Sequence, residues 1–513
     1  MKHNAISMTG VTLVMITSMT VEGKRSESAP FSYVWGKAYH ILPETHNNES
    51  GYFSLCEGLD GSIYVGTAKY GVNSYLVEFD PGTETQKIVI DTHKVCGLTD
   101  TGYAAQAKIH TRNFVGDSGK IYVGSMQGYP TEQDKRDDVK YPGGYLMTYD
   151  PRTGEAECLG MPYKGEGIID VAADEARGLI YVVTVQQGLW MLYDVKSKEY
   201  RELGPKLANL ATTLFDASGR AVAITRDSQL AQYDPDSGKL VTRDILVDRK
   251  KINLDESATW ILSDDARSAY LIRLTNPTLI EIDLMGTSFD VKATAHGRMV
   301  KGKNPDSRCA LTLSPDGQVY ALVRVKNKTS FGSGNLHHLA RFDPMTKKID
   351  HLGVLAVENP DFFFSSPGAR RGHPATSEDS PPYYGYHKLP DGTLTPLLNH
   401  LGLIAADDGT LYVTIIYPFT LLRLDAFKLG RFSDHHRRGQ TTLKSTLPKD
   451  ENREVRTWTS KAGVTMRAAV VEEKGEYVVL KKEDGSRAMI RKTRLSKADV
   501  VYIESLKTTA TSE

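Results

Sequence analysis

The sequence predicts an all-β fold: a seven-bladed β-propeller closed by its own N-terminal strand, then a linker and a small barrel. Three observations predict it. One strand-and-turn pattern recurs seven times between residues 31 and 429 of the 513-residue chain. The composition, with 44 Gly and 26 Tyr, suits many short strands and turns. A polar stretch after residue 430 then separates this repeat from a second group of strand-like segments.

The first part of each repeat is a turn followed by a strand of the Gly-x-Ile-Tyr-Val kind. The seven copies begin at Gly61, Gly119, Gly178, Gly219, Ser268, Gly317 and Gly409. The second part is a strand that ends in Asp, and its copies end at Asp80, Asp150, Asp194, Asp234, Asp283, Asp343 and Asp425. The two parts alternate strictly along the chain. Where Pro follows the Asp, its fixed φ and the Asp side chain together favour a tight turn.

Another strand-like segment precedes and follows each copy, which gives four strands per repeat. Four strands recurring every ~40 to 60 residues are typical of propeller blades. In this pattern, residues 31–429 resemble propellers of the YVTN and WD type. A sandwich would not return the same turn seven times.

The last repeat lacks its fourth strand, because the chain becomes polar after Asp425. The segment Trp35–Leu42 is similar to the outer strands of other repeats, for example Lys348–Leu352. Pairing this segment with the last repeat would remove an open sheet edge. The sequence therefore predicts a ring over residues 31–429 that the N-terminal strand closes. Two long insertions, at 130–144 and 361–386, interrupt the pattern, and loops of that length are usually functional or mobile.

The N-terminus, residues 1–30, fits two descriptions. Lys2 and His3 precede a modest apolar stretch, Gly10–Ile16, as in a weak secretory signal peptide, and the alternative is a disordered tail. No apolar run reaches the roughly 20 residues of a membrane-spanning helix. We expect an extracytoplasmic protein, periplasmic or secreted, with a cytoplasmic location as the alternative.

Net charge and cysteine spacing exclude several classes of protein. Sixty-three basic residues balance sixty-three acidic ones, so chain-wide attraction to nucleic acid or an anionic membrane is not expected. The four cysteines lie far apart and form no Cys-x-x-Cys motif, which indicates neither a zinc site nor a redox pair. We expect Cys56, Cys96, Cys158 and Cys309 to be buried, unreactive thiols.

The C-terminal segment has a linker at 430–455 and strand-like stretches between 456 and 508. Arg456–Thr459, Val478–Lys482, Asp484-Gly485 and Leu495–Asp499, with Tyr502, resemble the SLA homology domain one, a Src-homology-3-like barrel. That family implies a small barrel that serves as an accessory module and, in an endocytic adaptor, binds Asn-Pro-Phe-x-Asp peptides. The match runs through core and turn positions, so no binding residue is carried over.

Candidate site residues come from the inner strands, whose ends surround the central channel of a propeller. His110 and His400 each interrupt an apolar inner strand, and with Arg308 they are the candidate catalytic residues, acting as base or metal ligand and as anion-neutralising group. The candidate ligand-binding residues are Glu57, Lys108, Asp170, Thr212 and Trp260.

Two functions are compatible with these residues. Central channels are wet and polar in any propeller, so satisfied His and Arg side chains are expected there without catalysis. The favoured hypothesis is a non-catalytic scaffold that binds a protein, a peptide or a small carbohydrate-like ligand, with the barrel as a tethered second contact. The alternative is a lyase or hydrolase acting on a sugar acid or lactone. No cofactor is predicted; a divalent metal in the channel belongs to the enzymatic alternative.

Overall fold

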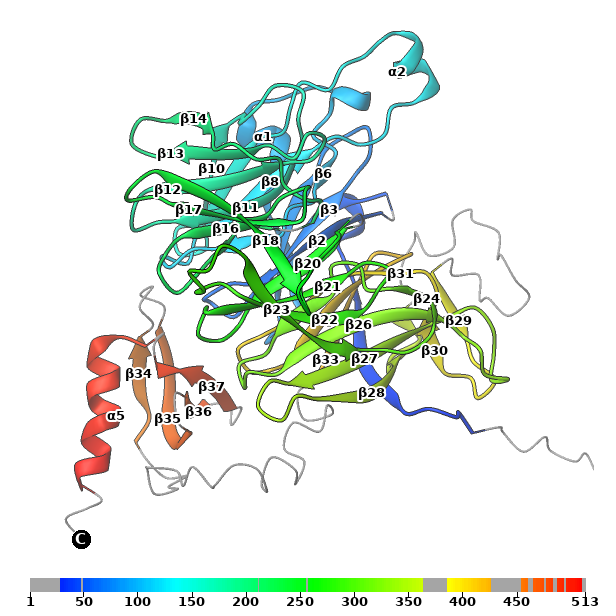
Figure 1. Cartoon of the computed structure of the whole chain (residues 1–513). Coiled ribbons are helices and arrows are strands. Elements are labelled where there is room, and N and C mark those ends of the chain that lie inside the picture. Colours follow the sequence, from blue (N-terminus) through cyan, green and yellow to red (C-terminus); the bar gives the residue numbers. More distant parts are fainter. Residues whose placement is uncertain are drawn as a thin grey trace, which may run out of the picture.

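The computed structural model in Figure 1 describes residues 28–47, 49–210, 212–254, 257–362, 385–425, 454–459, 465–474, 477–482, 487–492 and 495–509. The described part is all-β, with curled antiparallel sheets of the β-propeller kind. Its α-helices are α1 (Thr92–Cys96), α2 (Glu132–Arg136) and α5 (Lys497–Thr509). The expected signal peptide or tail, most of the second insertion and the linker fall largely outside the described residues.

The strands up to residue 251 fall into successive antiparallel groups. The first contains β2 (Glu49–Glu57), β3 (Ile63–Ala68), β4 (Tyr75–Asp80) and β5 (Thr85–Asp91). The second contains the short β6 (Lys108–Ile109) and β7 (Phe114–Val115), then β8 (Ile121–Met126), β9 (Leu146–Asp150) and β10 (Glu155–Gly160). The third contains β11 (Ile168–Asp174), β12 (Leu179–Thr184), β13 (Trp190–Asp194) and β14 (Glu199–Glu202). The fourth contains β15 (Leu214–Phe215), β16 (Ala221–Ile224), β17 (Gln229–Asp234) and β18 (Lys239–Val247), which also pairs with β19 (Lys250–Lys251).

The later strands continue the same order. The next group contains β20 (Ala258–Leu262), β21 (Ser268–Arg273), β22 (Thr278–Asp283) and β23 (Val291–Arg298). After it come β24 (Lys303–Asp306) and β25 (Leu311–Leu313), both paired with β26 (Val319–Lys326), then β27 (Asn335–Asp343) and β28 (Lys348–Val357). The last contains β31 (Asn399–Ala405), β32 (Leu411–Ile416) and β33 (Thr420–Leu424), preceded by a hairpin of β29 (Tyr386–Lys388) and β30 (Leu394–Pro396).

Strand β1 (Tyr33–His40) joins the two ends of this chain of sheets. Its second half pairs antiparallel with β33, with Ala38 opposite Leu422. Its first half runs parallel to β28, with Val34 opposite Leu355. The N-terminal strand therefore pairs with the last sheet, as the sequence predicts, and also binds that sheet to the one before it.

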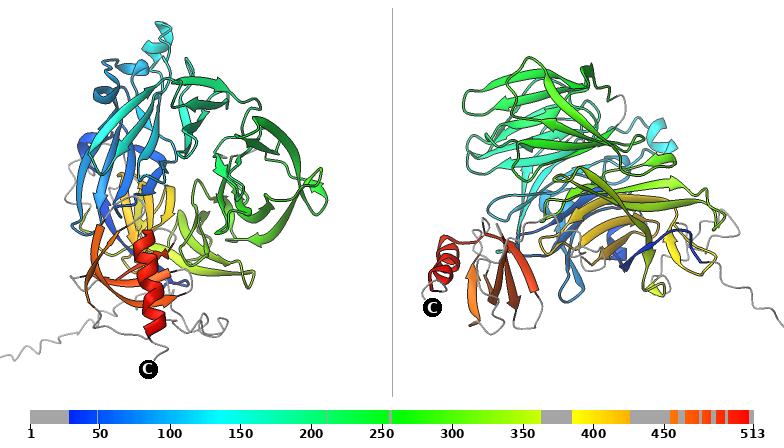
Figure 2. Two further views of the ribbon diagram at one scale, coloured as in Figure 1. Left: turned by 90° about the vertical axis from the view of Figure 1, so that its left-hand side faces the viewer. Right: turned by 60° about the horizontal axis from the view of Figure 1, so that its bottom comes forward.

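The hydrophobic core lies between successive sheets. Several clusters combine residues from two neighbouring groups, such as Tyr270 of β21 with Phe342 of β27. One cluster packs Phe79 of β4 against Tyr412 of β32, and so joins the first sheet to the last. Figure 2 shows the blue strands near the N-terminus beside the yellow strands of residues 399–424. Each large apolar side chain buried in this way contributes about 1.5–3 kcal/mol, so packing around the ring holds the sheets together.

The Asp turns form as their sequence predicts. The Asp80 carboxylate accepts hydrogen bonds from the Gly82 amide (2.8 Å) and the Thr83 hydroxyl (2.9 Å). Glu84 then adopts a left-handed φ of 58° before the outer strand begins. The same side-chain chemistry sets the turn after Asp234, where the Ser237 hydroxyl donates over 2.6 Å.

The C-terminal module is a meander of β34 (Arg456–Thr459), β35 (Thr465–Lys474), β36 (Tyr477–Lys482) and β37 (Arg487–Arg491), with α5 after it. Trp458 lies in its core and donates its indole N–H to the Ala468 carbonyl over 2.8 Å. Ser496 caps the helix, because its hydroxyl accepts the Asp499 amide at 3.1 Å. The Asp499 carboxylate in turn accepts from the Thr459 amide (2.7 Å) and from Arg456 (2.9 Å), which fixes the helix to the sheet.

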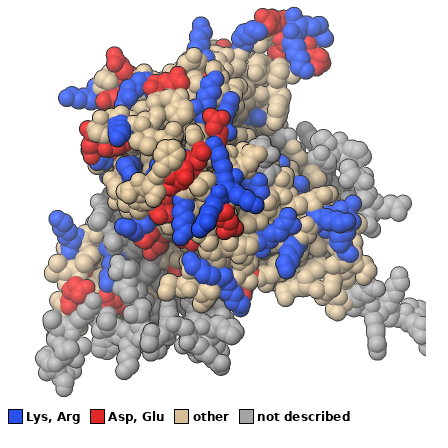
Figure 3. Space-filling model, viewed as in Figure 1, with Lys and Arg blue, Asp and Glu red and all other residues tan. Residues whose placement is uncertain are grey.

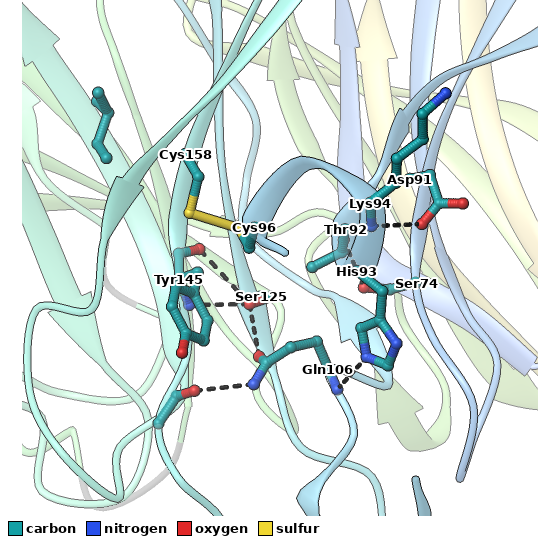
Figure 4. The surroundings of a disulfide bond; sticks show 12 residues. Ser74, Asp91, Thr92, His93, Lys94, Cys96, Gln106, Ser125, Tyr145 and Cys158 are labelled. Carbon is teal, nitrogen blue, oxygen red and sulfur yellow. Dashed lines mark hydrogen bonds between the residues drawn. A yellow bond between two sulfur atoms is a disulfide. The ribbon is translucent and has the colours of Figure 1, made fainter. Parts of the chain in front are cut away.

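The prediction of four unreactive thiols is wrong for one pair. Cys96, at the end of α1, forms a disulfide with Cys158 of β10 across a sequence separation of 62 (Figure 4). Cys56 and Cys309 are free and buried, as expected. Spacing along the chain could not reveal the pair, because only the ring brings the outer strands of the first two sheets side by side.

Figure 3 shows Lys and Arg interspersed with Asp and Glu on the face in view, including the helix α2 of the first insertion. That insertion is partly helical: the Thr131 hydroxyl and the Asp134 carboxylate form a capping box at its start. No helix in the described residues is both long and apolar enough to cross a membrane.

Candidate binding site in the central cavity

A cavity of about 260 Å³ lies where the inner strands converge. Its walls come from β2, β20, β25 and β31 and from the loops that lead into β7 and β15. Apolar side chains such as Phe53, Leu55 and Leu403 form part of the lining. Its charged groups are Arg112, Glu57 and Asp407. A concave, largely apolar site with a few converging polar groups is the usual form of a small-molecule site.

Arg112 is the cation of the cavity. Its Nη1 donates to the Trp260 carbonyl and its Nη2 to the Thr213 carbonyl, each over 3.3 Å. Burial lowers the Arg112 pKa, and nearby Asp170 opposes this. Because an Arg side chain stays protonated in proteins, the cavity wall carries a fixed positive charge.

Asp170 stands behind this cation. An isolated parallel backbone bridge pairs Arg112 with Asp170, and the Asp170 Oδ2 accepts the Thr213 amide at 2.6 Å. Burial raises the pKa of Asp170, while Arg112 acts in the opposite direction. The other oxygen, Oδ1, has no hydrogen-bond partner among the described residues. Asp170 therefore holds the loop before β15 and moderates the charge of Arg112.

The charges of the other sign come from β2 and the turn after β31. The Glu57 carboxylate accepts the backbone amide of Asp407 over 2.7 Å, which joins the first sheet to the last at the cavity. The cavity thus has a guanidinium from the second sheet and carboxylates from the first and last.

Two thiols also line the cavity, those of Cys56 and Cys309. Burial raises the pKa of both, so both stay protonated at neutral pH. A thiol in that state is a poor nucleophile. These cysteines therefore act as small apolar wall residues.

The candidate catalytic residues lie elsewhere. His400, at the start of β31, meets His337 of β27 through their Nδ1 atoms, 2.9 Å apart. Burial lowers the pKa of His400 to about 4, so its ring is neutral at pH 7. Arg308 forms an ion pair with Asp306 (3.3 Å), to which Arg324 also binds (3.0 Å). None of these residues belongs to the cavity lining.

His110 and Lys108 lie at the start of the second sheet. His110 is buried directly after β6 and does not line the cavity. The Lys108 ammonium lies over two aromatic rings, 4.8 Å from the Tyr70 centroid and 4.2 Å from the Tyr129 centroid. That cation–π pairing joins Lys108 to Tyr129, the residue directly before the first insertion.

Of the candidate ligand-binding residues, Glu57 and Thr212 line the cavity. Trp260 is fully buried, and its indole N–H donates to the Thr212 carbonyl over 2.6 Å. Asp170 and Trp260 thus position cavity residues from behind. Their assignment to ligand binding stays a prediction, as does that of Lys108.

Sequence reasoning missed Arg112 and Asp407. Arg112 lies two residues after His110, and a cation so close to a candidate site residue is the signal that could have found it. Asp407 lies in a turn that reads as solvent-exposed, and only the approach of Glu57 brings it to the cavity. Within the described ranges, no group of three or more His, Cys, Asp or Glu side chains could hold a metal ion.

No protein-family model and no curated protein matches this sequence. Among solved structures, the extracellular domain of a hybrid two component system from B. thetaiotaomicron is similar over 77% of this chain, at 13% identity and a TM-score of 0.42; the match spans 42% of that chain. The Myceliophteria thermophila Cps50 (Swd1) β-propeller domain matches 76% of this chain and 100% of its own, at 9% identity and a TM-score of 0.44. The periplasmic gluconolactonase PpgL of Pseudomonas aeruginosa matches 70% of this chain and 92% of its own, at 13% identity and a TM-score of 0.40.

Proposed function

We propose that residues 31–429 form a seven-bladed propeller that acts as a non-catalytic binding scaffold, with a small ligand in its central cavity. The observation that carries the proposal is the convergence of Arg112, Glu57 and Asp407 on one cavity whose other walls are largely apolar. Polar groups of both signs in such a site fix the orientation of a ligand, and the apolar wall excludes water around it.

The size of the cavity limits the ligand. At about 260 Å³ it lies just below the range of roughly 300–1,000 Å³ that is typical of sites for drug-sized molecules. A molecule of monosaccharide size suits this space, and a folded protein segment does not. A carbohydrate-like ligand is therefore favoured for the cavity, and a protein or peptide partner for the outer faces.

The chemistry of the cavity favours binding over catalysis. Its described lining contains no histidine, and its two thiols stay protonated. His400 is held by His337, and Arg308 by Asp306, away from the lining. The enzymatic alternative needs a proton-transferring group within hydrogen-bond reach of the substrate. The candidate residues for that role do not line this cavity.

The C-terminal module, residues 456–508, is proposed to be a Src-homology-3-like barrel of the SLA homology domain one kind that binds a peptide. Its four-stranded antiparallel meander, the buried Trp458 and the helix fixed by Asp499 support this assignment. Connected by the linker at 430–455, two weak sites on one chain can reach useful avidity, because the second contact becomes intramolecular.

An extracytoplasmic location is part of the same proposal. The disulfide between Cys96 and Cys158 supports it, because such bonds persist in oxidising compartments and are rare in the cytosol.

Blocking the cavity tests the proposed function. The Ala405→Leu variant adds bulk to the cavity wall, and Ala217→Leu makes the same change on an exposed turn as its control. Glucose, glucuronate, gluconate and gluconolactone serve as probes in isothermal titration calorimetry. We expect at least one probe to bind the wild type and the control, and Ala405→Leu to lose that binding. Equal binding by all three proteins, or binding of no probe at millimolar concentration, would contradict a ligand site in this cavity.

A further inference from the structure

The geometry points to Arg112 as an anion-binding group: it holds the carboxylate of a monoanionic, hydroxyl-bearing ligand. This inference rests on the proposed function, because it assigns the chemical class of ligand to the same cavity.

The hydrogen-bonding capacity of Arg112 is only partly used by the protein. A guanidinium has five N–H donors, and Arg112 gives two of them to the carbonyls of Trp260 and Thr213. Both bonds are long, at 3.3 Å. The remaining three donors have no acceptor among the described residues, although the side chain lies in the cavity wall. Arg112 is half-buried and lines the cavity, so a ligand in the cavity can reach these donors in place of water.

The fixed position of the guanidinium favours a planar anion as that ligand. The two carbonyls come from the loop before β15 and from β20, so groups from two different sheets hold the Arg112 guanidinium in place. A guanidinium fixed in this way can meet a carboxylate through two parallel N–H···O bonds, which are shorter and stronger than bonds between neutral groups.

Asp170 does not take this role within the protein. Its carboxylate forms no ion pair with Arg112 within 4.0 Å among the described residues, and its Oδ2 is engaged by the Thr213 amide. Burial raises the pKa of Asp170, and the charge of Arg112 opposes that shift. A half-buried cation with no ion-paired carboxylate among the described residues is stabilised by an anion that a ligand brings.

The two carboxylates in the lining limit the charge of that ligand. Glu57 and Asp407 repel a second negative group, and carboxylate oxygens accept hydrogen bonds from hydroxyls. One carboxylate at Arg112 and hydroxyls elsewhere therefore match the whole cavity. A sugar acid of monosaccharide size has this distribution, and a phosphate dianion does not.

The test compares a matched pair of probes, glucuronate and glucose, which differ in one carboxylate. Calorimetry measures both affinities for the wild type, for Arg112→Lys and Arg112→Gln, and for the control Arg341→Lys. Arg341 is a half-buried arginine paired with Asp350 on an outer strand pair. The readout is the ratio of the two affinities, which a general loss of stability does not change.

We expect the wild type and Arg341→Lys to prefer glucuronate, and both Arg112 variants to bind it roughly 10- to 100-fold more weakly. The affinity of both Arg112 variants for glucose should stay within about twofold of the wild-type value. A selective loss of glucuronate binding of this kind supports the inference. Inorganic phosphate should compete poorly with glucuronate.

Three results would overturn the inference. Equal affinity of the wild type for both sugars would do so, as would an unchanged ratio in Arg112→Lys and Arg112→Gln, or tight competition by phosphate. Where glucose still binds in those cases, the cavity site of the proposed function stands. Where neither sugar binds and Ala405→Leu has no effect, the proposed function fails as well.

Discussion

Arg112 and Asp170 are neighbours across a parallel backbone bridge, and both side chains hold the same residue, Thr213, the first at its carbonyl and the second at its amide. Through Thr213 the second and third sheets fix the loop that leads into the fourth. The pair thus orders the cavity wall, and within the described part of the chain Arg112 has no carboxylate at ion-pair distance.

Asp170 gives the fold a specific pH dependence. Burial raises its pKa in the folded state, so the folded protein binds a proton there more tightly than the unfolded chain does. Its contribution to stability is therefore greatest below the unfolded pKa of about 3.9 and is lost as the pH rises through the folded value. The wild type should therefore lose stability relative to Asp170→Asn as the pH rises from 4. The difference between their free energies of unfolding should shift in favour of the variant. Urea titrations at a series of pH values check this, and a constant difference between the two proteins would contradict it.

His400 gives the stability of the fold the opposite pH dependence. Its pKa falls to about 4 on burial, so the unfolded chain binds the proton first as the pH drops. Stability should fall between pH 6.5 and pH 4 by an amount that approaches about 3 kcal/mol for this residue. In His400→Asn that slope should become shallower, as measured by chemical unfolding. His337, whose pKa burial also lowers, should behave in the same way. A variant with the wild-type slope would show that the pair does not titrate as described.

The Cys96–Cys158 bond should stabilise the ring. It closes a loop with a sequence separation of 62, and a disulfide of that span contributes about 2–4 kcal/mol, mainly by restricting the unfolded chain. Cys158→Ser should lower the melting temperature by several degrees, and reductant should lower that of the wild type but not that of the variant. Mass spectrometry under non-reducing conditions checks the bond itself. Two free thiols at these positions would contradict it.

The two ends of the chain should differ in their effect on the propeller. Removal of residues 28–40 deletes β1, which pairs with both β28 and β33, and should abolish cooperative unfolding. Removal of residues 430–513 should leave the melting transition of the propeller unchanged, because none of its described strands pairs with the C-terminal module. Differential scanning calorimetry of both truncations checks this, with the intact chain as reference. Loss of the main transition in the C-terminal truncation would place the boundary elsewhere.

Features that depend on neighbouring residues could be predicted from the sequence. The turns after Asp80 and Asp234 form as their residues predict, the helix cap at Ser496 is in place, and the segment after Tyr33 pairs with the last sheet. In each case neighbouring residues, or one alternating pattern, carry the information.

The residues that line the cavity were harder to predict from the sequence. Glu57 and Thr212, two of the predicted site residues, line the cavity, and so does Arg112, which the sequence analysis does not single out. Which residue of an inner strand faces the axis depends on register, and the shifts within the β2–β3, β11–β12 and β31–β32 pairs move it. A one-residue shift exchanges the two faces of a strand, so periodicity alone could not assign His400 to the contact with His337.

By itself, the sequence determined an all-β repeat, its turns and the strand that joins its ends, because those features depend on short-range spacing and alternation. Only the tertiary structure decided that Cys96 meets Cys158 and that Arg112, Glu57 and Asp407 share one cavity. Those residues are far apart along the chain, and the packing of whole sheets around a common axis sets the distances between them.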